Sequence, residues 1–389
     1  MVNRRCAFIG IVSASRTHSR ANFKASLASH RVIPLTYRTP MAQPAHAVPT
    51  IDLSIFVGES LQQVPNEERI KVGQRLVETL HRFGFIKITG HGFPKHDIDE
   101  ALAWTKRLFD LSLEEKMKAP HPPGPMPHRG YSSIGKEKVY SQTDVGDHKE
   151  NGNVGQSLRK ISDFKESYEI GSEQDPVQQN IWLPEDVLPG FRGYMTTLYD
   201  RLLDVSKTIL GAIAIGLLLE AEEYTEFIKL ISDQHCQLRL LHYPEVTKEK
   251  LQNELLARLP AHNDWGTMTL LFQDERGGLE LKDPRAQEFL SAEPEEGALV
   301  LNIGDMLQRF TNDYFVSALH RVTIPDPDAV SELGIPARYS IPFFVAPDFS
   351  YTIATLERFI TADSPPKYNP VRFDEYGSLI SKYQYQDSE

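Results

Sequence analysis

Cysteine is scarce in this chain of 389 residues, which holds only Cys6 and Cys236. Asn-x-Ser/Thr acceptor sites for N-glycosylation are absent. Two cysteines cannot build the disulfide framework of a small secreted domain, so the composition indicates a reducing compartment. The longest uncharged apolar stretch, Thr208–Leu219, has twelve residues, whereas a membrane-spanning helix needs roughly 20. We therefore expect no membrane partner and a cytoplasmic location.

Acidic residues are absent from the first 40 positions, which contain seven Lys or Arg residues. The rest of the chain holds 35 basic against 53 acidic residues, a formal charge of −18 for residues 41–389. So acidic a segment is poorly suited to the negatively charged phosphate backbone of DNA or RNA, and we expect no nucleic-acid partner. The basic leader has the composition of a mitochondrial transit peptide. Two other interpretations stay open: Cys6–Val12 as a signal-peptide core, and Met41 as the true start of translation.

Hydrophobic patterning changes character along the chain. Apolar residues keep helical spacing through much of the first half, whereas short β-type runs separated by Gly, Pro and Asp clusters follow from Gln237 to Val345. Such evenly spaced short strands favour a sandwich or jelly roll over alternating βαβ units. The expected parts are residues 1–45, a leader or disordered extension; 46–232, an α-rich amino-terminal region with loop insertions; 233–350, a jelly-roll domain; and 351–389, a closing segment with a helix near 372–386.

Local signals place several boundaries within this outline. Asn66 is the expected start of a helix that Gly84 ends, and Ser112 with Glu115 forms a capping box for a short helix. Residues 119–131 contain five prolines and residues 141–163 are polar, so both segments are predicted to be loops. Histidines 121 and 128 lie among those prolines and are predicted to be solvated.

His262 and Asp264 are two residues apart, so in an extended chain both side chains point to the same face. An isolated pair of this kind is more often a surface turn than a metal site. His320, however, lies 56 residues after Asp264 in an apolar β-type run. Two histidines and one carboxylate form the facial triad of non-haem Fe(II) oxygenases. The same three ligands also suit a catalytic Zn²⁺ ion, so a zinc hydrolase stays open as an alternative.

Arg338 and Ser340 form a second pair on one face of an expected strand. A guanidinium fork with a hydroxyl beside it suits a fixed carboxylate, because arginine can bind both oxygens in parallel. An arginine paired with a local acid at a strand edge is the plainer interpretation. Tyr243, which precedes Pro244, could add a phenol to the same carboxylate.

The order His-x-Asp, a distant His and Arg-x-Ser on a β-rich segment resembles the Fe(II)- and 2-oxoglutarate-dependent dioxygenases, specifically their isopenicillin N synthase-like branch. The likeness extends over about 48–345 and includes Phe85–Gly92 and Gly277–Leu281. Arg129–Ser132 and Lys165–Gly171 are similar to fungal members, among them thymine 7-hydroxylase and oxygenases of secondary metabolism. This resemblance implies an α+β fold with a double-stranded β-helix (jelly roll) core, an α-rich amino-terminal region and a carboxy-terminal helix.

The resemblance also assigns residues to roles. It implies Fe(II) bound by His262, Asp264 and His320, and 2-oxoglutarate held by Arg338, Ser340 and Tyr243, with O2 as the second cosubstrate. No residue acts as an acid or base in this scheme, because the chemistry occurs at iron. The expected reaction releases succinate and CO2 and hydroxylates a small molecule, with desaturation or ring closure as variants. A fungal secondary metabolite or a heteroaromatic compound is the expected substrate.

Two departures from the family pattern stand out. The usual Asn-Tyr-Tyr-Pro sequence is Leu241-His242-Tyr243-Pro244 here, so one polar contact of the plant enzymes is missing. Residues 326–334 add a polar stretch that we expect to form a surface loop. The predicted substrate pocket consists of Phe344, Phe272, Trp265, Tyr131 and Arg239. Its aromatic members could equally belong to the jelly-roll core.

Two further alternatives to this enzyme class stay open. One is an iron oxidase of the same fold that uses no 2-oxoglutarate, in which Arg338 and Ser340 would hold a carboxylate of the substrate itself. The other is a non-catalytic scaffold on a degenerate fold, which would bind no iron.

Overall fold

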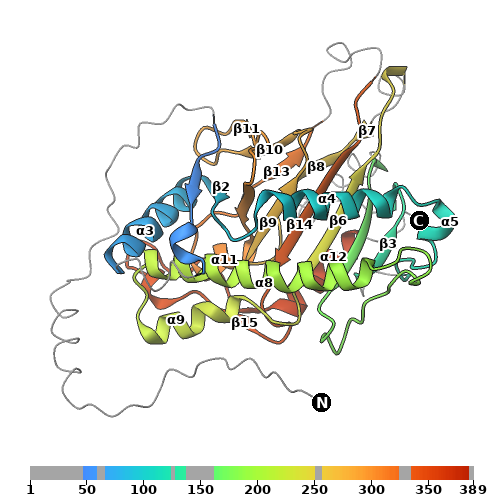
Figure 1. Ribbon diagram of the computed structural model, residues 1–389. Coiled ribbons are helices and arrows are strands. Elements are labelled where there is room, and N and C mark those ends of the chain that lie inside the picture. Colours follow the sequence, from blue (N-terminus) through green and yellow to red (C-terminus); the bar gives the residue numbers. More distant parts are fainter. Residues whose placement is uncertain are drawn as a thin grey trace, which may run out of the picture. The chain divides into compact units, whose positions relative to one another are not determined.

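Two β-sheets carry the fold, an eight-stranded sheet and a four-stranded one (Figure 1). The computed structural model describes residues 47–58, 66–123, 128–136, 162–249, 256–323 and 334–384. In sheet order the large sheet comprises β1 (Thr50–Asp52), β2 (Phe85–Thr89), β12 (Leu299–Ile303), β9 (Met268–Gln273), β14 (Arg338–Val345), β6 (Gln237–Tyr243), β5 (Glu166–Gly171) and β3 (Gly130–Ser132). The small sheet comprises β11 (Phe289–Ser291), β10 (Leu279–Lys282), β13 (His320–Val322) and β8 (Leu259–His262). Apart from the parallel pair β1–β2, neighbouring strands in both sheets are antiparallel.

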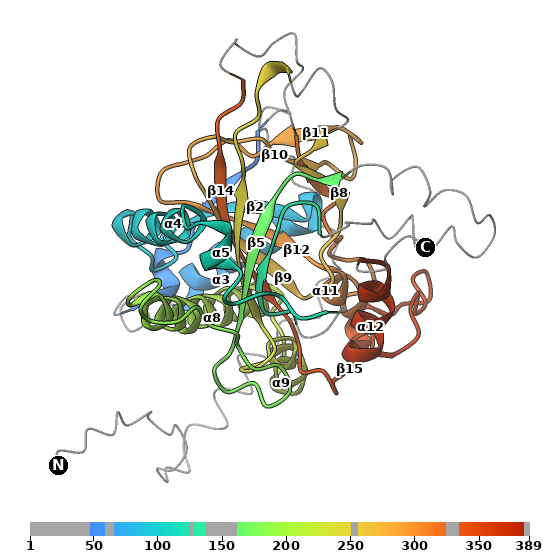
Figure 2. The same ribbon diagram turned by 90° about the vertical axis from the view of Figure 1, so that its right-hand side faces the viewer.

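Helices cover one face of the large sheet. Figure 2 shows α3, α4 and α8 on one side of this sheet, with the small sheet and α12 on the other. The α-helices are α3 (Asn66–Phe83), α4 (Lys95–Phe109), α5 (Leu113–Lys116), α8 (Phe191–Gly216), α9 (Ala221–Phe227), α11 (Asp305–Phe310) and α12 (Phe373–Gln384). Short elements complete the chain: the 3-10 turns Ser54–Phe56, Ile228–Leu230 and Glu357–Phe359, and the strand pairs β4 (Ser162–Asp163) with β7 (Leu256–Ala257) and β15 (Thr352–Ile353) with β16 (Val371–Arg372).

Period-two alternation divides the large sheet into a core face and a cavity face. On β14, Ile341 and Phe343 belong to the hydrophobic core beneath the helices, whereas Arg338, Ser340 and Phe344 line a cavity. Residues of β6 likewise alternate between the core face and the cavity face, because β6 pairs with β14 in a fixed antiparallel register. One face of the sheet therefore supplies packing, and the opposite face is available for a site.

The predicted fold class is confirmed, together with several boundaries. The first long helix spans Asn66–Phe83, and Gly84 ends it with φ +73° and an amide that donates to the Leu80 carbonyl at 2.8 Å. Ser112 and Glu115 form the predicted capping box. The expected strand Gln237–Tyr243 is reproduced as β6.

Some expectations stay predictions. Residues 1–45, most of 141–163 and most of 326–334 lie outside the described residues. The division at 232/233 also stays a prediction, and the large sheet continues across it, since β1, β2, β3 and β5 join the same sheet as β6 and β14. In the part of the chain that is described, no helix has both the length and the apolar character needed to cross a bilayer.

A buried ionic cluster ties α5, β3, β5 and β6 together. Glu166 is 4% exposed, and its Oε2 accepts from Lys116 Nζ at 2.8 Å and from the Tyr131 hydroxyl at 2.5 Å. Its Oε1 lies 2.7 Å from His242 Nδ1. Burial alone would raise the pKa of Glu166, but hydrogen bonds from His242, Lys116 and Tyr131 lower it overall. The carboxylate is therefore ionised and holds three segments on one side of the sheet.

Replacing Glu166 with glutamine tests this cluster. The change leaves Lys116 buried without its counter-charge, so we expect the free energy of unfolding to fall by about 3 kcal/mol, as measured by urea denaturation. Asp110→Asn is the matched control, because its ion pair with Lys106 is exposed and should change stability by roughly 0.5 kcal/mol or less. Equal effects of the two substitutions would contradict a structural role for the buried cluster.

Candidate metal centre and active site

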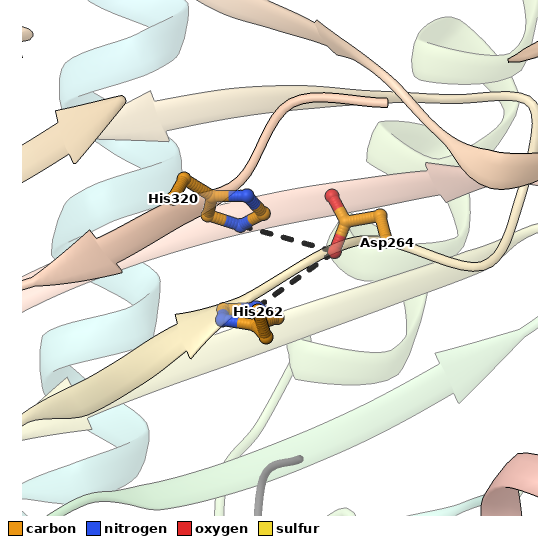
Figure 3. Close-up of side chains that lie close together, drawn as sticks. All are labelled: His262, Asp264 and His320. Carbon is orange, nitrogen blue, oxygen red and sulfur yellow. Dashed lines mark ion pairs between the residues drawn. The ribbon is translucent and has the colours of Figure 1, made fainter. Parts of the chain in front are cut away.

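His262, Asp264 and His320 converge between the two sheets. His262 ends β8, His320 begins β13, and the two residues are directly opposite in the antiparallel register of these strands. The Nε2 atoms of both histidines lie 3.9 Å from Asp264 Oδ1. Figure 3 shows both imidazoles turned toward the carboxylate. Within the described residues this is the one group of three or more His, Cys, Asp or Glu side chains whose ligand atoms gather, all within 4.8 Å of one another.

Both imidazoles are held in the orientation that a metal ligand needs. The Nδ1 atom of His262 lies 2.9 Å from the Pro260 carbonyl oxygen, and that of His320 lies 2.9 Å from the Ala318 carbonyl oxygen. A carbonyl oxygen can only accept, so each Nδ1 donates and each Nε2 carries its lone pair toward Asp264. Burial, with a contribution from the neighbouring His320, lowers the pKa of His262 to about 3. This histidine is therefore neutral, as a ligand must be.

The carboxylate of Asp264 is also oriented by hydrogen bonds. Its Oδ2 accepts from Thr269 Oγ1 at 2.6 Å and from Asn302 Nδ2 at 2.8 Å, which leaves Oδ1 facing the histidines. Burial alone would raise the pKa of Asp264, but the two imidazoles and these hydrogen bonds lower it overall. The side chain is thus ionised and fixed before any ion binds.

Two glycines let the loop that carries Asp264 pack against β12 and β14. A Cβ at Gly304 would lie 2.3 Å from the Gly266 carbonyl oxygen, and a Cβ at Gly266 would lie 2.3 Å from that of Val345. Contacts so short exclude any side chain at either position. The Asp305 amide then donates to the Asp264 carbonyl at 2.9 Å, so the backbone of the loop is pinned as well.

The donor set fits Fe(II). Two imidazole nitrogens and one carboxylate oxygen on one side of a point leave the other positions of an octahedron open, which is the arrangement of non-haem iron oxygenases. The cavity beside the three side chains provides room for further ligands.

Arg338 lines the same cavity, is 1% exposed and lies directly opposite Tyr243 in the register of β14 and β6. Its Nη1 donates to Ser340 Oγ at 3.0 Å, its Nε to the Gly277 carbonyl at 2.7 Å and its Nη2 to Gln273 Oε1 at 3.0 Å. All three acceptors are uncharged, so none of these hydrogen bonds neutralises the positive charge of the guanidinium. The Tyr243 ring centroid lies 5.2 Å from the guanidinium carbon.

The cavity between metal centre, arginine and helix α12 has a volume of about 250 Å³. Its walls include Arg338, Ser340 and Phe344 of β14, Arg239 and Tyr243 of β6, Trp265 after β8, and Phe373 with Gly377 of α12. Apolar and aromatic side chains thus line much of the space, with a few polar groups among them. Pockets of this kind suit small organic ligands.

Comparisons with known proteins agree with this geometry. A family model described as non-haem dioxygenase in morphine synthesis, N-terminal, matches residues 48–187. A second, described as the 2OG-Fe(II) oxygenase superfamily, matches residues 234–347. The proline hydroxylase buaE of Petromyces alliaceus is 38% identical over 310 residues, which cover 79% of this chain and 91% of that protein. The 2-oxoglutarate-dependent dioxygenase htyE of Aspergillus rugulosus is 35% identical over 346 residues, covering 87% and 97%.

The chain belongs to the 2OG-Fe(II) oxygenase superfamily. Among solved structures, a full-length Neurospora crassa protein in complex with alpha-KG and thymine superposes with a TM-score of 0.72 at 31% identity, covering 88% of this chain and 98% of that one. The protein is a 2-oxoglutarate-dependent non-haem iron dioxygenase that uses Fe(II). The predictions of enzyme class and of both cofactors are therefore confirmed. The zinc hydrolase, the 2-oxoglutarate-independent oxidase and the scaffold are not needed to explain the site.

Two members of the predicted substrate pocket lie elsewhere in this oxygenase. On β9, Phe272 is an odd number of residues from Thr269 and Leu271, which line the cavity, so its ring turns to the core face. There it packs against Phe93, with 5.4 Å between the ring centroids. Tyr131 is buried on β3 with its hydroxyl on Glu166, outside the lining of the cavity.

The other three predicted pocket residues line the cavity, but the charge of Arg239 is balanced by an ion pair. Its Nε lies 2.5 Å from Oε1 of the fully buried Glu169, and its guanidinium carbon is 5.5 Å from the Phe344 ring centroid. Trp265 directly follows Asp264 and lies beside His128, with 6.3 Å between the ring centroids. A substrate therefore meets aromatic walls and a charge-balanced ion pair.

Sequence reasoning missed several residues around the cavity. The prediction that His121 and His128 are solvated is wrong, since they are 3% and 7% exposed, and His128 lines the cavity. Its backbone amide donates to Gln178, a residue 50 positions away, and no local pattern could reveal that burial. Asn302 was missed as well, although its place as a polar residue in the apolar run 299–303 was a usable signal.

Thr269→Val tests the orientation of Asp264. Valine keeps the size of threonine but removes the hydrogen bond to Oδ2, so we expect Fe(II) affinity to fall by about tenfold. Anaerobic metal titration measures the change. Thr105→Val is the matched control, since Thr105 is buried in α4 and bonds only the Ala101 carbonyl. Unchanged affinity in the Thr269 variant would show that the hydrogen bond does not prepare the carboxylate.

Proposed function

We propose that His262, Asp264 and His320 are the ligands of Fe(II). The observation that carries this assignment is that the Nε2 atoms of the two histidines and Oδ1 of the aspartate lie within 4.8 Å of one another. Each of these side chains is held by a hydrogen bond at its other nitrogen or oxygen atom. Such orientation by neighbouring groups is typical of metal ligands. Asp264 supplies the single negative charge of the set.

Arg338, Ser340 and Tyr243 bind the distal carboxylate of 2-oxoglutarate in this proposal. The support is the buried guanidinium, whose hydrogen-bond acceptors are all uncharged, beside a hydroxyl and a phenol at one end of the cavity. A fixed carboxylate on a buried arginine neutralises its charge and sets the position of the whole cosubstrate. The keto-acid end would then bind at the metal centre, whose proposed ligands line the same cavity.

Bound Fe(II) and 2-oxoglutarate supply oxidative decarboxylation, which yields succinate and CO2 and delivers one oxygen atom of O2 to a C–H bond. The residues of this chain bind the metal and the cosubstrate, orient the substrate and exclude water. Asp264, Thr269 and Asn302 hold the ligand geometry, and Arg338 holds the cosubstrate. Trp265 and Phe344 are walls that place the substrate C–H bond and keep the space dry.

The substrate we propose is a small cyclic nitrogen compound of fungal secondary metabolism, which the enzyme hydroxylates. A cavity of about 250 Å³ with aromatic walls and a buried Arg239–Glu169 pair supports a compact ring that carries amide or amine groups. The similar proteins support the same class, because one is named a proline hydroxylase and another was solved with thymine.

We also propose a cytoplasmic location, which the buried, unpaired Cys236 and the low cysteine content support. Fluorescence microscopy of the full chain with a carboxy-terminal fluorescent tag tests it. Signal throughout the cytoplasm is expected, and signal confined to mitochondria would favour the transit-peptide interpretation of the basic leader.

The role of Arg338 is tested by Arg338→Leu. Loss of the guanidinium should raise the KM for 2-oxoglutarate by at least about a hundredfold, since a buried charge pair is worth some 3 kcal/mol or more. Iron binding should stay within about twofold, because the arginine touches none of the three proposed ligands. Succinate release, measured by chromatography with a panel of cyclic amines and pyrimidines, gives the rate. An unchanged KM would contradict the assignment.

A further inference from the structure

Arg258 lies behind the part of the cavity wall that Tyr243 forms. It immediately precedes β8 and is 3% exposed. Its Nη2 donates at 2.6 Å to the carbonyl of Pro336, two residues before β14. Its guanidinium carbon lies 5.9 Å from the ring centroid of Tyr243 on β6. One side chain thus connects β8 with the strands that carry the proposed 2-oxoglutarate site.

Two arginines therefore share one phenol ring. The guanidinium of Arg338 lies 5.2 Å from the Tyr243 centroid and that of Arg258 lies 5.9 Å from it. The nearby acid Asp274 uses Oδ1 to accept from the Arg276 amide at 3.0 Å and Oδ2 to accept from the Tyr339 amide at 2.6 Å. Its oxygens are thus hydrogen-bonded to backbone amides, and its negative charge offsets part of the positive charge of both guanidiniums.

Positive charge is concentrated around Tyr243. Burial, and then the charge of Arg338, lower the pKa of Arg258 to about 10, so the side chain is still a cation at neutral pH. Among the described residues, its Nε is buried without a hydrogen-bond partner. Like charges held close together away from water cost free energy, and an anion beside them recovers that cost. The two buried guanidiniums beside Tyr243 therefore favour an anion in the adjoining part of the cavity.

We propose that Arg258 is a positioning residue for the cosubstrate, which strengthens binding of the distal carboxylate of 2-oxoglutarate through its charge and through its hold on Tyr243. The inference rests on the proposed function of Arg338, Ser340 and Tyr243. Arg258 is not part of the cavity lining, so it acts from behind the binding residues and touches no reacting atom. Its effect should depend on the carboxylate that it supports.

The experiment compares two keto acids on the full-length, Fe(II)-loaded chain without oxygen, with calorimetry as the readout. The two are 2-oxoglutarate and 2-oxopentanoate, which has a methyl group in place of the distal carboxylate. In Arg258→Leu the Kd for 2-oxoglutarate should rise by about tenfold, the size expected for one charge acting at a distance. The Kd for 2-oxopentanoate should stay within about twofold of the original protein, because no distal charge is present for Arg258 to attract.

Conservative and control variants separate charge from structure. Arg258→Lys keeps the positive charge and should recover part of the lost affinity, whereas the uncharged Arg258→Gln should not. Arg276→Leu removes a half-exposed arginine whose backbone amide donates to Asp274. This change should leave both Kd values unchanged, since water screens the charge of Arg276. If Arg258→Leu does not fold, Lys and Gln at position 258 provide the same comparison.

Two results would overturn the inference. Equal weakening of both keto acids would mean that Arg258 only braces the two sheets, and an unchanged Kd for 2-oxoglutarate would mean that it does not act on the cosubstrate.

Arg338→Leu in the same assay identifies which proposal fails. If Arg338→Leu weakens the binding of 2-oxoglutarate more than that of 2-oxopentanoate and Arg258→Leu does not, only the inference about Arg258 is lost. If Arg338→Leu fails to distinguish them, the proposed cosubstrate site itself is wrong.

Discussion

The antiparallel pairing of β8 with β13 is the constraint on which the site depends. It sets His262 directly opposite His320, and both imidazoles then face the space between the sheets. A slip of one residue would turn one imidazole to the other face of the small sheet. Asp264 completes the set from a loop whose close packing at Gly266 and Gly304 leaves no room for a side chain. Strand register and loop packing therefore determine the geometry before any metal arrives.

The cavity wall has two parts with different physical character. At Arg338, a buried positive charge lies among uncharged hydrogen-bond acceptors, which suits a dianionic cosubstrate. Toward α12, aromatic walls such as Trp265 and Phe373 replace charge, and the ion pair of Arg239 with Glu169 is already neutralised. In the proposed assignment, the cosubstrate and the substrate therefore contact separate parts of the cavity wall.

Sequence alone could predict what depends on short-range pattern. Period-two spacing placed Arg338 and Ser340 on one face, and β6 was predicted with its observed bounds. The failures concern contacts between segments far apart in the chain. Phe272 was assigned to the pocket because its face could not be related to the metal site without the register of β9, and His128 was judged solvated because its partner Gln178 lies 50 residues away. Tertiary packing decides burial at such positions.

The central claim is that one Fe(II) ion held by His262, Asp264 and His320 binds 2-oxoglutarate against Arg338. Anaerobic titration of the full chain with Fe(II) and then 2-oxoglutarate tests it most directly, with visible absorption as the readout. We expect a weak charge-transfer band that saturates at one equivalent of each component and is lost in the His320→Ala variant. An identical band in that variant, or no band in the original protein, would contradict the account.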